Sequence, residues 1–473
     1  LVGLPDTALH EARDRVRAAL VNSGEAWPNR RITVNLLPAW LPKHGSSFDL
    51  AVATTVLAGA GMLPLAPLGG VVLLGELGLD GTVRPVRGVL PCILAAARAG
   101  MTRAVVPLGN AHEASLVPGV TVCATDTLRR LIDFVRGTGR LLDAPPPPGP
   151  PPHQSLPDLS DVLGQEFGRR ALEVAAAGGH HLFLVGPPGA GKTMLAQRLP
   201  SVLPPLDDDA ALEVSAVHSI AGTLPAGAPM IRRPPFQAPH HTASAAALVG
   251  GGSGMARPGA LSLAHHGVLF LDEAPEFTSH ALEALRQPLE DGIVTIHRSR
   301  GHATYPARIQ LVLAANPCPC AKPAGDSSCE CSALTRRRYL ARLSGPLLDR
   351  VDLRVSLPPL TSAQLSRDIL GAEPSSAVLA RVVAARGAAG ERWARFGRRT
   401  NADVSGAQLR DRAFRLPAGV SRQLTTHLDR GTLSARGMDR VVRVAWSIAD
   451  LDGRDRPGAD DVAEALYLRG GLR

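Results

Sequence analysis

A glycine-rich turn between a short apolar run and a helical stretch constrains this chain more than any other feature. It spans Leu182 to Thr193, and its Gly-x4-Gly-Lys-Thr spacing, with a strand pattern before it and a helix pattern after it, is typical of a P-loop. Backbone N–H groups of such a turn point at phosphate oxygens, and the following helix N-terminus adds positive charge. The sequence therefore predicts a nucleoside triphosphate site formed by Gly186, Pro187, Pro188, Gly189, Ala190, Gly191, Lys192 and Thr193.

The lysine of this turn stands out because arginine supplies almost every other positive charge. Three of the 51 lysine and arginine residues are lysines. A compact ammonium suits the β- and γ-phosphates better than the planar fork of arginine does. We therefore assign Lys192 to the phosphates, and Thr193 to a Mg²⁺ ion bound with ATP.

Two later apolar runs end in polar residues that suit ATP hydrolysis. One ends in Asp272 and Glu273, and the next ends in Asn316. Asp272 is predicted to bind Mg²⁺ through water, and Glu273 to activate the attacking water as general base. Asn316 is suited to hold that water near the γ-phosphate. With a capped helix expected over 161–175, these features predict an α/β P-loop NTPase core at 158–361.

An arginine near the end of this core is expected to act across a subunit boundary. Arg350 is our choice for an arginine finger that reaches the γ-phosphate of a neighbouring subunit, and Arg354 lies close enough to compete for the role. A finger of this kind contributes about 10³ to 10⁵ in rate in NTPases.

The pattern from 362 to 473 is helical, with Gly and Pro breaks, and predicts a C-terminal helical lid. Ser434 is expected to cap one of its helices, which puts Arg436 in the first helical turn. A cation is unfavourable at a helix N-terminus unless it faces an anion. We interpret Arg436 as a second nucleotide sensor, and a role in surface solubility is the alternative.

Residues 1–140 carry the patterns of a small α+β domain. We expect helices over 7–21 and 93–99, and strands over 31–37, 71–74 and 104–106. The uncharged stretch from Leu50 to Gly75 is interrupted by Pro64, Pro67 and two adjacent glycines. It therefore predicts a buried helix followed by a strand, and no membrane span.

Part of this domain resembles the proteolytic domain of Lon-type proteases, over 75–89, 94–100 and 105–110. Residues 42–47 are similar to the segment that carries their nucleophile, which would place Ser47 at that position. The family also needs a lysine as base. The matching segment has Leu90, Pro91 and Cys92 instead, and the chain has no lysine between 43 and 192. We expect a Lon-like fold without peptidase activity, with Ser47 as a turn residue.

The sequence gives three further expectations, for a linker, for the cellular compartment and for the N-terminus. Residues 141–157 are proline-rich and predict an extended linker. No signal-peptide pattern opens the chain, so we expect a cytoplasmic protein without a membrane partner. Because the chain begins at Leu1 and not at Met, we expect the first domain to be N-terminally incomplete.

The stretch from Asp291 to Ala307 predicts a β-hairpin with His297, Arg298 and Arg300 near its tip. In a ring, such hairpins point into the central channel, where these side chains could grip a phosphate backbone. A solvated charged turn is the alternative. The net charge of +9 suits a nucleic-acid partner, while the aromatic content of 3% argues against base stacking as the main mode of binding.

Four of the six cysteines form two Cys-x-Cys pairs separated by eight residues. Four thiolates in this arrangement predict either a tetrahedral Zn²⁺ site or reduced cysteines in a loop. So long a chain with six cysteines is no disulfide scaffold. The candidate zinc ligands are Cys318, Cys320, Cys329 and Cys331.

In this order, the motifs resemble those of the magnesium-chelatase-like AAA+ ATPases of the ComM/YifB family, over the whole chain except the linker. The stretches that carry the resemblance are 238–242, 257–265, 316–320 and 434–436. The resemblance implies a Lon-like N-terminal domain, a chelatase-type AAA+ core and a helical lid. It also implies a homohexameric cytoplasmic ATPase that acts on DNA and migrates branched junctions in recombination during natural transformation.

Three functions therefore stay open at the level of sequence. The first is a ring ATPase that moves DNA. The second is a chelatase motor that drives insertion of Mg²⁺ into a tetrapyrrole, and the fused Lon-like domain argues against it. The third is an ATP-dependent protease, which the missing lysine base contradicts.

Overall fold

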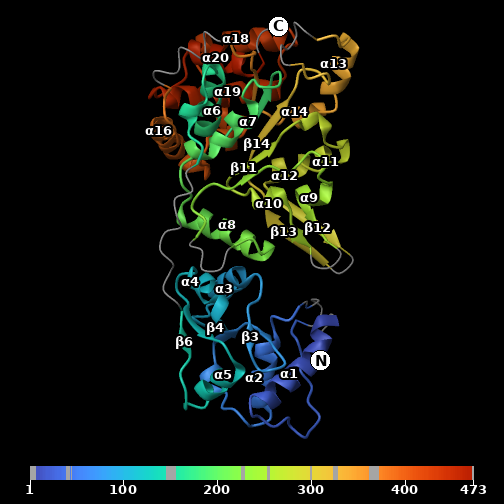
Figure 1. The fold of residues 1–473 in the computed structure, drawn as a ribbon. Helices are drawn as coiled ribbons and strands as arrows, with labels where there is room; N and C mark the ends of the chain where they lie inside the picture. The colour runs from blue at the N-terminus through green and yellow to red at the C-terminus, as the bar shows by residue number, and fades with distance from the viewer. Residues whose placement is uncertain are drawn as a thin grey trace.

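The computed structural model describes residues 7–38, 43, 45–144, 156–224, 230–252, 256–298, 301–322, 329–361 and 372–470. These residues form an N-terminal region and a larger second region that carries the P-loop (Figure 1). No helix among them is both long and apolar enough to cross a membrane.

The N-terminal region is a small mixed sheet covered by helices. Strands β1, β4 and β5 run parallel, and β6 closes the sheet as an antiparallel edge in the order β1-β4-β5-β6. The helices are α1 (Thr7–Asn22), α2 (Asp49–Gly59), α3 (Val89–Arg98), α4 (Ala111–Ser115) and α5 (Leu128–Val135). The strands are β1 (Val71–Leu73), β2 (Glu76–Leu77), β3 (Val83–Arg84), β4 (Arg103–Pro107), β5 (Thr121–Thr125) and β6 (Leu142–Asp143).

The strand expected over 31–37 is wrong. Within the described residues, this segment forms only an isolated bridge at Asn35. Ile32 and Val34 do pack against the core cluster of this region. The alternation therefore reports correctly which side chains are half-buried, but no neighbouring strand extends the pairing into a ladder.

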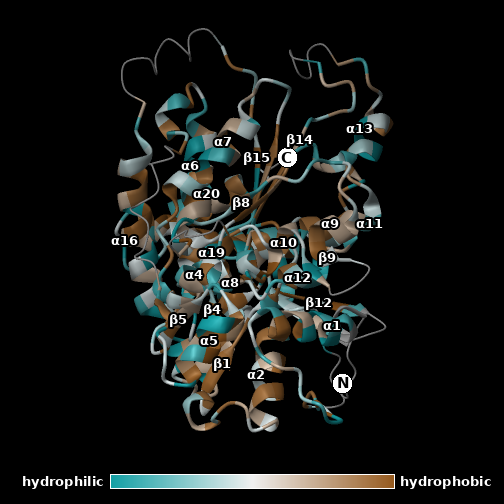
Figure 2. Cartoon of the chain, turned by 60° about the horizontal axis from the view of Figure 1, so that its bottom comes forward, coloured by the Kyte–Doolittle hydropathy of each residue, from teal (hydrophilic) through white to brown (hydrophobic). Residues whose placement is uncertain are grey.

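The second region is built on a five-stranded parallel sheet in the order β15-β7-β14-β11-β8. Alternate residues of its central strands enter two different core clusters, one on each face. This is why the central strands are mostly apolar (Figure 2), as parallel strands buried on both faces are. The strands are β7 (Leu182–Val185), β8 (Phe236–Gln237), β9 (Gly250–Gly251), β10 (Arg257–Pro258), β11 (Val268–Leu271), β12 (Ile293–Arg298), β13 (Gly301–Pro306), β14 (Gln310–Ala315) and β15 (Leu353–Ser356).

Helices cover both faces of this sheet. Several begin at a Ser, Thr or Asp whose side chain accepts a backbone N–H of the first turn, as at Asp207, Thr278, Ser332 and Ser344. The helices of the core are α6 (Glu166–Gly178), α7 (Lys192–Arg198), α8 (Asp208–Ala221), α9 (Ala245–Val249), α10 (Ala260–Leu263), α11 (Ser279–Glu283), α12 (Arg286–Asp291), α13 (Ala333–Leu340) and α14 (Gly345–Leu348).

The C-terminal part of the chain is helical, as predicted. It consists of α16 (Ser375–Trp393), α17 (Gly406–Leu409), α18 (Ala418–Asp429), α19 (Ala435–Leu451) and α20 (Ala459–Leu468). Its buried residues belong to the same core cluster as α6 and one face of the sheet. The helical C-terminal part is therefore packed on the sheet that carries the P-loop and shares its core.

The helix expected over 161–175 begins later than predicted. Asp161 ends a short 3-10 turn and pairs with Arg198 at 2.8 Å, while α6 starts at Glu166 without a side-chain cap. Gly164 has a φ of 75°, a left-handed conformation that interrupts the helical path between the two.

Helix α8 joins the two regions. It packs along α3 of the N-terminal region, and the face of α8 that carries Ala216 contributes to the core cluster of that region (Figure 1). The Ser219 hydroxyl of α8 donates a hydrogen bond to Glu113. Glu113 also accepts the backbone N–H of Leu90 at 3.1 Å. The N-terminal region is thus docked on a helix that follows the P-loop helix in sequence.

Candidate nucleotide-binding site

The predicted P-loop lies at the carboxyl end of β7 and leads into α7. Gly186 has no room for a side chain, because a Cβ there would lie 2.7 Å from the carbonyl oxygen of Leu357. Gly191, which precedes the first residue of α7, has a φ of 83° that favours glycine. A Cβ on Gly189 would meet no atom within 4 Å, so the turn is open on that side. These conformations expose a row of backbone amides at the helix N-terminus.

Lys192 lies inside this turn with 8% of its surface exposed. Its ammonium donates to the carbonyl oxygens of Gly186 at 2.7 Å and Pro187 at 2.9 Å, and to the Asn316 side-chain oxygen at 3.1 Å. Burial lowers the pKa of Lys192, and the nearby carboxylates of Asp272 and Glu273 oppose that shift. The ammonium is therefore held between the loop and the end of β14.

The two carboxylates predicted from the apolar run follow β11 directly. Asp272 accepts a hydrogen bond from the Thr193 hydroxyl at 2.7 Å and from the backbone N–H of Glu273 at 2.9 Å. Glu273 has a φ of 49°, which is uncommon for a residue with a side chain. The Glu273 side chain is exposed. The structure brings Lys192, Thr193 and both carboxylates to one edge of the sheet, as parallel strand order requires.

His241 is a residue of this site that sequence reasoning missed. Its Nδ1 lies 3.3 Å from a carboxylate oxygen of Glu273. The centroids of the His240 and His241 rings lie 4.0 Å apart. Both histidines follow β8, the strand next to β11 in the sheet. The sequence of 238–242 indicates only a family resemblance. Its place beside Glu273 follows from the pairing of β8 with β11, which the sequence does not reveal.

We expect His241→Ala to lower kcat for ATP by about 10-fold to 100-fold with little change in nucleotide affinity, because an unfixed base is misplaced in the reacting complex. Steady-state ATPase kinetics and a nucleotide-binding titration separate the two effects. His241→Asn, which keeps a polar partner for Glu273, should retain most of the activity. His280→Ala, an exposed change on α11, is the control. An unchanged kcat in His241→Ala would contradict the positioning role.

Of the two finger candidates, Arg350 lies between α14 and β15, and Arg354 is the second residue of β15. Arg350 pairs with Glu290 and donates to the Pro346 carbonyl oxygen at 2.8 Å. Arg354 donates to the Leu348 carbonyl oxygen at 2.7 Å, and burial lowers its pKa. Neither guanidinium contacts the P-loop of its own chain, and the choice between them stays a prediction.

The other predicted residues lie at separate places. Ser434 caps α19 by accepting the Gly437 N–H at 3.1 Å, as expected, and leaves the exposed Arg436 in the first turn. No described residue makes a hydrogen bond or ion pair with the Arg436 side chain. The β12–β13 hairpin forms as predicted, with His297 paired to His302 near its end. The Arg298 side chain and the whole of Arg300 lie outside the described residues.

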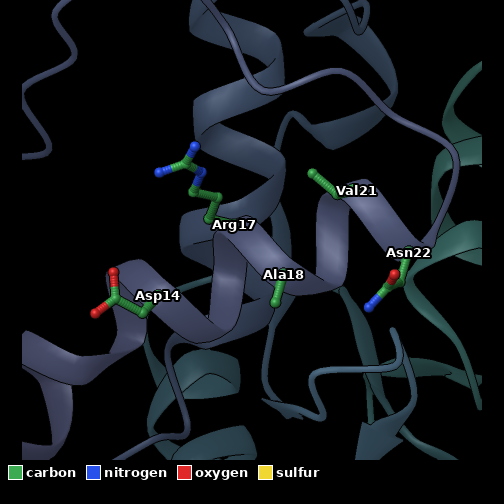
Figure 3. Close-up of a pocket in the computed structure, with 5 residues that line it drawn as sticks. All are labelled: Asp14, Arg17, Ala18, Val21 and Asn22. Atoms are coloured by element: carbon green, nitrogen blue, oxygen red, sulfur yellow. The ribbon is translucent and has the colours of Figure 1, made fainter.

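The four candidate zinc ligands lie together, between Asn316 and α13. A hollow elsewhere on the surface, on the exposed face of α1, belongs to the N-terminal region and has no part in this site (Figure 3). It is lined by Asp14, Arg17, Ala18, Val21 and Asn22.

Comparison with known proteins fits this fold. A family described as "Magnesium chelatase, subunit ChlI" matches residues 158–365, which include the P-loop and both carboxylates. "Subunit ChlI of Mg-chelatase" matches residues 1–110, and "Magnesium chelatase, subunit ChlI C-terminal" matches residues 372–469. The parallel sheet, the P-loop and these matches define the class: a magnesium-chelatase-like protein with an AAA+-like core.

Relatives match over nearly the full chain. An uncharacterized protein of Mycobacterium tuberculosis is 57% identical over 473 residues, 99% of this chain and 92% of the relative. The uncharacterized protein YifB of Escherichia coli is 41% identical over 469 residues, 99% of this chain and 91% of YifB. The competence protein ComM of Haemophilus influenzae is 40% identical over 477 residues, 100% of this chain and 92% of ComM. The chain belongs to the ComM/YifB family, and membership implies the use of a nucleotide and Mg²⁺.

The likeness of the N-terminal region to Lon proteases has weaker support. The Lon protease 2 of Bacillus subtilis is 29% identical over 100 residues, which are 21% of this chain and 18% of that protein. Leu90, which belongs to the segment where the family carries its lysine, is fully buried in the core of this region.

Proposed function

We propose that this protein is an ATP-hydrolysing ring motor that acts on DNA in recombination and natural transformation. The observation that carries the ATPase part is the convergence of Lys192, Thr193, Asp272, Glu273 and Asn316 at one sheet edge. In this proposal the P-loop amides and Lys192 bind the phosphates of ATP, and Glu273 takes the proton of the attacking water. Asn316 holds that water near the γ-phosphate.

The residues present suit Mg²⁺, which prefers oxygen ligands. The Thr193 hydroxyl and the Asp272 carboxylate lie 2.7 Å apart and both face the P-loop turn. We propose that Thr193 binds the ion directly and that Asp272 holds it through water. When bound, Mg²⁺ would offset the negative charge of the phosphates. Removal of divalent ions with EDTA should therefore abolish hydrolysis.

A ring is proposed because the chain carries a finger candidate that its own site does not use. Arg350 would serve the nucleotide of the adjacent subunit, and Arg436 on the lid helix α19 would act as second sensor. The family's AAA+-like core favours oligomers, and a homohexamer is the state that the family resemblance implies. Mass measurement in solution, with and without ATP, tests this.

The DNA part rests on different observations. The chain has a net charge of +9, and its hairpin is anchored at its root by Val294 and Tyr305 while His297 and His302 are exposed. Such a hairpin suits contact with a phosphate backbone. The relative from Haemophilus influenzae is named a competence protein. The deciding measurement is the ATPase rate against single-stranded, duplex and forked DNA, with Glu273→Gln as the inactive control.

We expect Arg298→Ala/Arg300→Ala to lose most of the DNA stimulation while keeping the basal ATPase rate. Each lost phosphate contact should also lower the slope of log affinity against log salt by about 0.9. DNA-binding titrations at several salt concentrations measure this. Arg422→Ala/Arg430→Ala removes the same charge from two exposed residues, one on α18 and one directly after it, and is the matched control. Equal stimulation in both double variants would remove the hairpin from the proposal.

A chelatase motor is the second candidate, because the matched families are described by the magnesium chelatase subunit ChlI. Co-purification of tetrapyrrole-handling proteins, together with an ATPase that DNA leaves unchanged, would favour it. A protease is the least supported function. Casein should stay intact in the presence of ATP, since Leu90, Pro91 and Cys92 stand in the segment where the family carries its lysine.

A further inference from the structure

The two Cys-x-Cys pairs meet in the segment that links the nucleotide site to α13. The Cys318 and Cys320 sulfurs lie 3.1 Å apart, and the Cys329 sulfur lies 3.3 Å from the first and 3.6 Å from the second. With Cys331 included, all four sulfurs lie within 4.8 Å of one another. Cys318 is buried and the other three are half-buried. We call these four residues the thiol cluster.

We propose that the thiol cluster binds one Zn²⁺ ion as a structural site. Zinc–sulfur bonds of about 2.3 Å place the four sulfurs of a tetrahedron about 3.8 Å apart, close to the separations in the cluster. A disulfide would join sulfurs in pairs at about 2.05 Å, whereas here all four sulfurs lie within 4.8 Å of one another. An iron–sulfur cluster would hold its thiolates on different iron atoms and so further apart.

The surroundings of the cluster fit a bound cation with four thiolates. Ala321 has a φ of 47°, which turns the chain back after the first pair. Lys322 pairs with Glu330 at 2.6 Å and so connects the two halves across the cluster.

A second group of potential ligands does not fit a metal in the same way. Glu213 lies 3.1 Å from Nε2 of His265 and 3.4 Å from Nε2 of His266. Nδ1 of His265, however, accepts the backbone N–H of Arg308 at 3.0 Å. The proton of the His265 ring must then be on Nε2, where it donates to Glu213 and blocks coordination. This group is a satisfied hydrogen-bond network.

The position of the zinc site gives it a role in the nucleotide site. Cys318 follows Asn316 by two residues, and Asn316 accepts the hydrogen bond from Lys192. On the other side, the cluster leads into α13, whose Tyr339 is buried. We infer that the metal fixes the turn after β14 and thereby the direction of Asn316. This consequence rests on the proposed ATPase function, but the binding of zinc does not.

The test measures the metal directly on the purified full chain. We expect about one zinc per chain by elemental analysis after dialysis. Cys320→Ser/Cys331→Ser should lose it, while Cys92→Ser/Cys123→Ser, which changes the two cysteines outside the cluster, should keep it. Circular dichroism of each variant reports folding.

A second variant and a thiol count keep the result interpretable. Cys329→His should retain zinc, since a Cys₃His set is also a zinc site. In wild type, two thiols should react readily with a disulfide reagent, and four more only after a strong chelator is added. A folded wild-type chain without zinc, with iron in its place, or with all six thiols equally reactive, would overturn the proposal.

The ATPase readout separates this inference from the proposed function. The double serine variant should show a kcat lower by about 10-fold or more with ATP affinity largely kept, because Asn316 is misdirected. Zinc without any ATPase activity in wild type would remove the proposed function and leave the metal site. ATPase activity in a zinc-free wild type would remove the metal site alone. A zinc-free double variant with the wild-type kcat would remove only the claim that the metal positions Asn316.

Discussion

Glu273→Gln is expected to lower kcat for ATP by about 10² to 10⁴-fold while the protein still binds the nucleotide. Glutamine keeps the shape and the hydrogen-bonding capacity of the side chain but cannot take a proton from water. Lys192 and Thr193, which are assigned to the phosphates and Mg²⁺, are unchanged in this variant. Steady-state hydrolysis and a titration with a fluorescent ATP analogue measure the two properties separately.

The matched control for this substitution lies three residues further on. Glu276→Gln makes the same chemical change on a carboxylate that pairs with Arg342 at 3.0 Å. It should leave kcat within about 2-fold, since exposed ion pairs contribute little. If Glu273→Gln keeps a kcat close to that of Glu276→Gln, another group must activate the water, and the role given to Glu273 fails.

The nucleotide site could be predicted from sequence because its signals are local. The P-loop spacing specifies a turn, and the apolar runs before Asp272 and Asn316 specify buried strands. Parallel strands then bring their carboxyl ends to one edge, whatever their order in the sheet. The separation between Lys192 and Asn316 in sequence is 124 residues, yet the hydrogen bond between them follows from this rule.

Contacts that depend on sheet order or on lid docking could not be predicted in this way. His241 reaches Glu273 because β8 neighbours β11, which no local pattern reveals. The failed strand at 31–37 has the same origin, since alternation reports burial and says nothing about a partner strand. The prediction starts the helix at Asp161 because Asp is a common cap, but the left-handed conformation of Gly164 interrupts the helical path between Asp161 and α6.

The lid also packs on residues 350–352, which include the finger candidate Arg350, and the sequence does not predict this contact. Arg440 of α19 donates to the Arg350 carbonyl oxygen at 3.0 Å and to the Asp352 carboxylate at 2.6 Å. Arg469, just after α20, donates to the Val351 carbonyl oxygen at 3.0 Å. Two lid elements therefore hold the backbone of the finger candidate. A movement of the lid on nucleotide binding would move Arg350 with it.

Arg350→Ala is expected to lower kcat by about 10³ to 10⁵-fold in the assembled ring, with nucleotide affinity nearly unchanged. The guanidinium would stabilise charge that develops only in the transition state, on the nucleotide of the adjacent subunit. Arg354→Ala is the comparison that decides between the two candidates. Its effect should be smaller, because Arg354 lies within β15 of its own sheet, half-buried and bonded to the Leu348 carbonyl oxygen.

Mixing two inactive variants shows whether Arg350 acts on its own site or on that of a neighbour. A Glu273→Gln subunit carries an intact finger, and an Arg350→Ala subunit carries an intact base. If the finger acts in trans, a complete site forms wherever the first donates its arginine to the second, at about a quarter of the sites in an equal mixture. ATPase activity should then reappear on mixing and be highest when the two variants are present in equal amounts. No recovery in rings shown by mass to contain both variants would mean that base and arginine serve the same chain, and the arginine would then act within its own subunit.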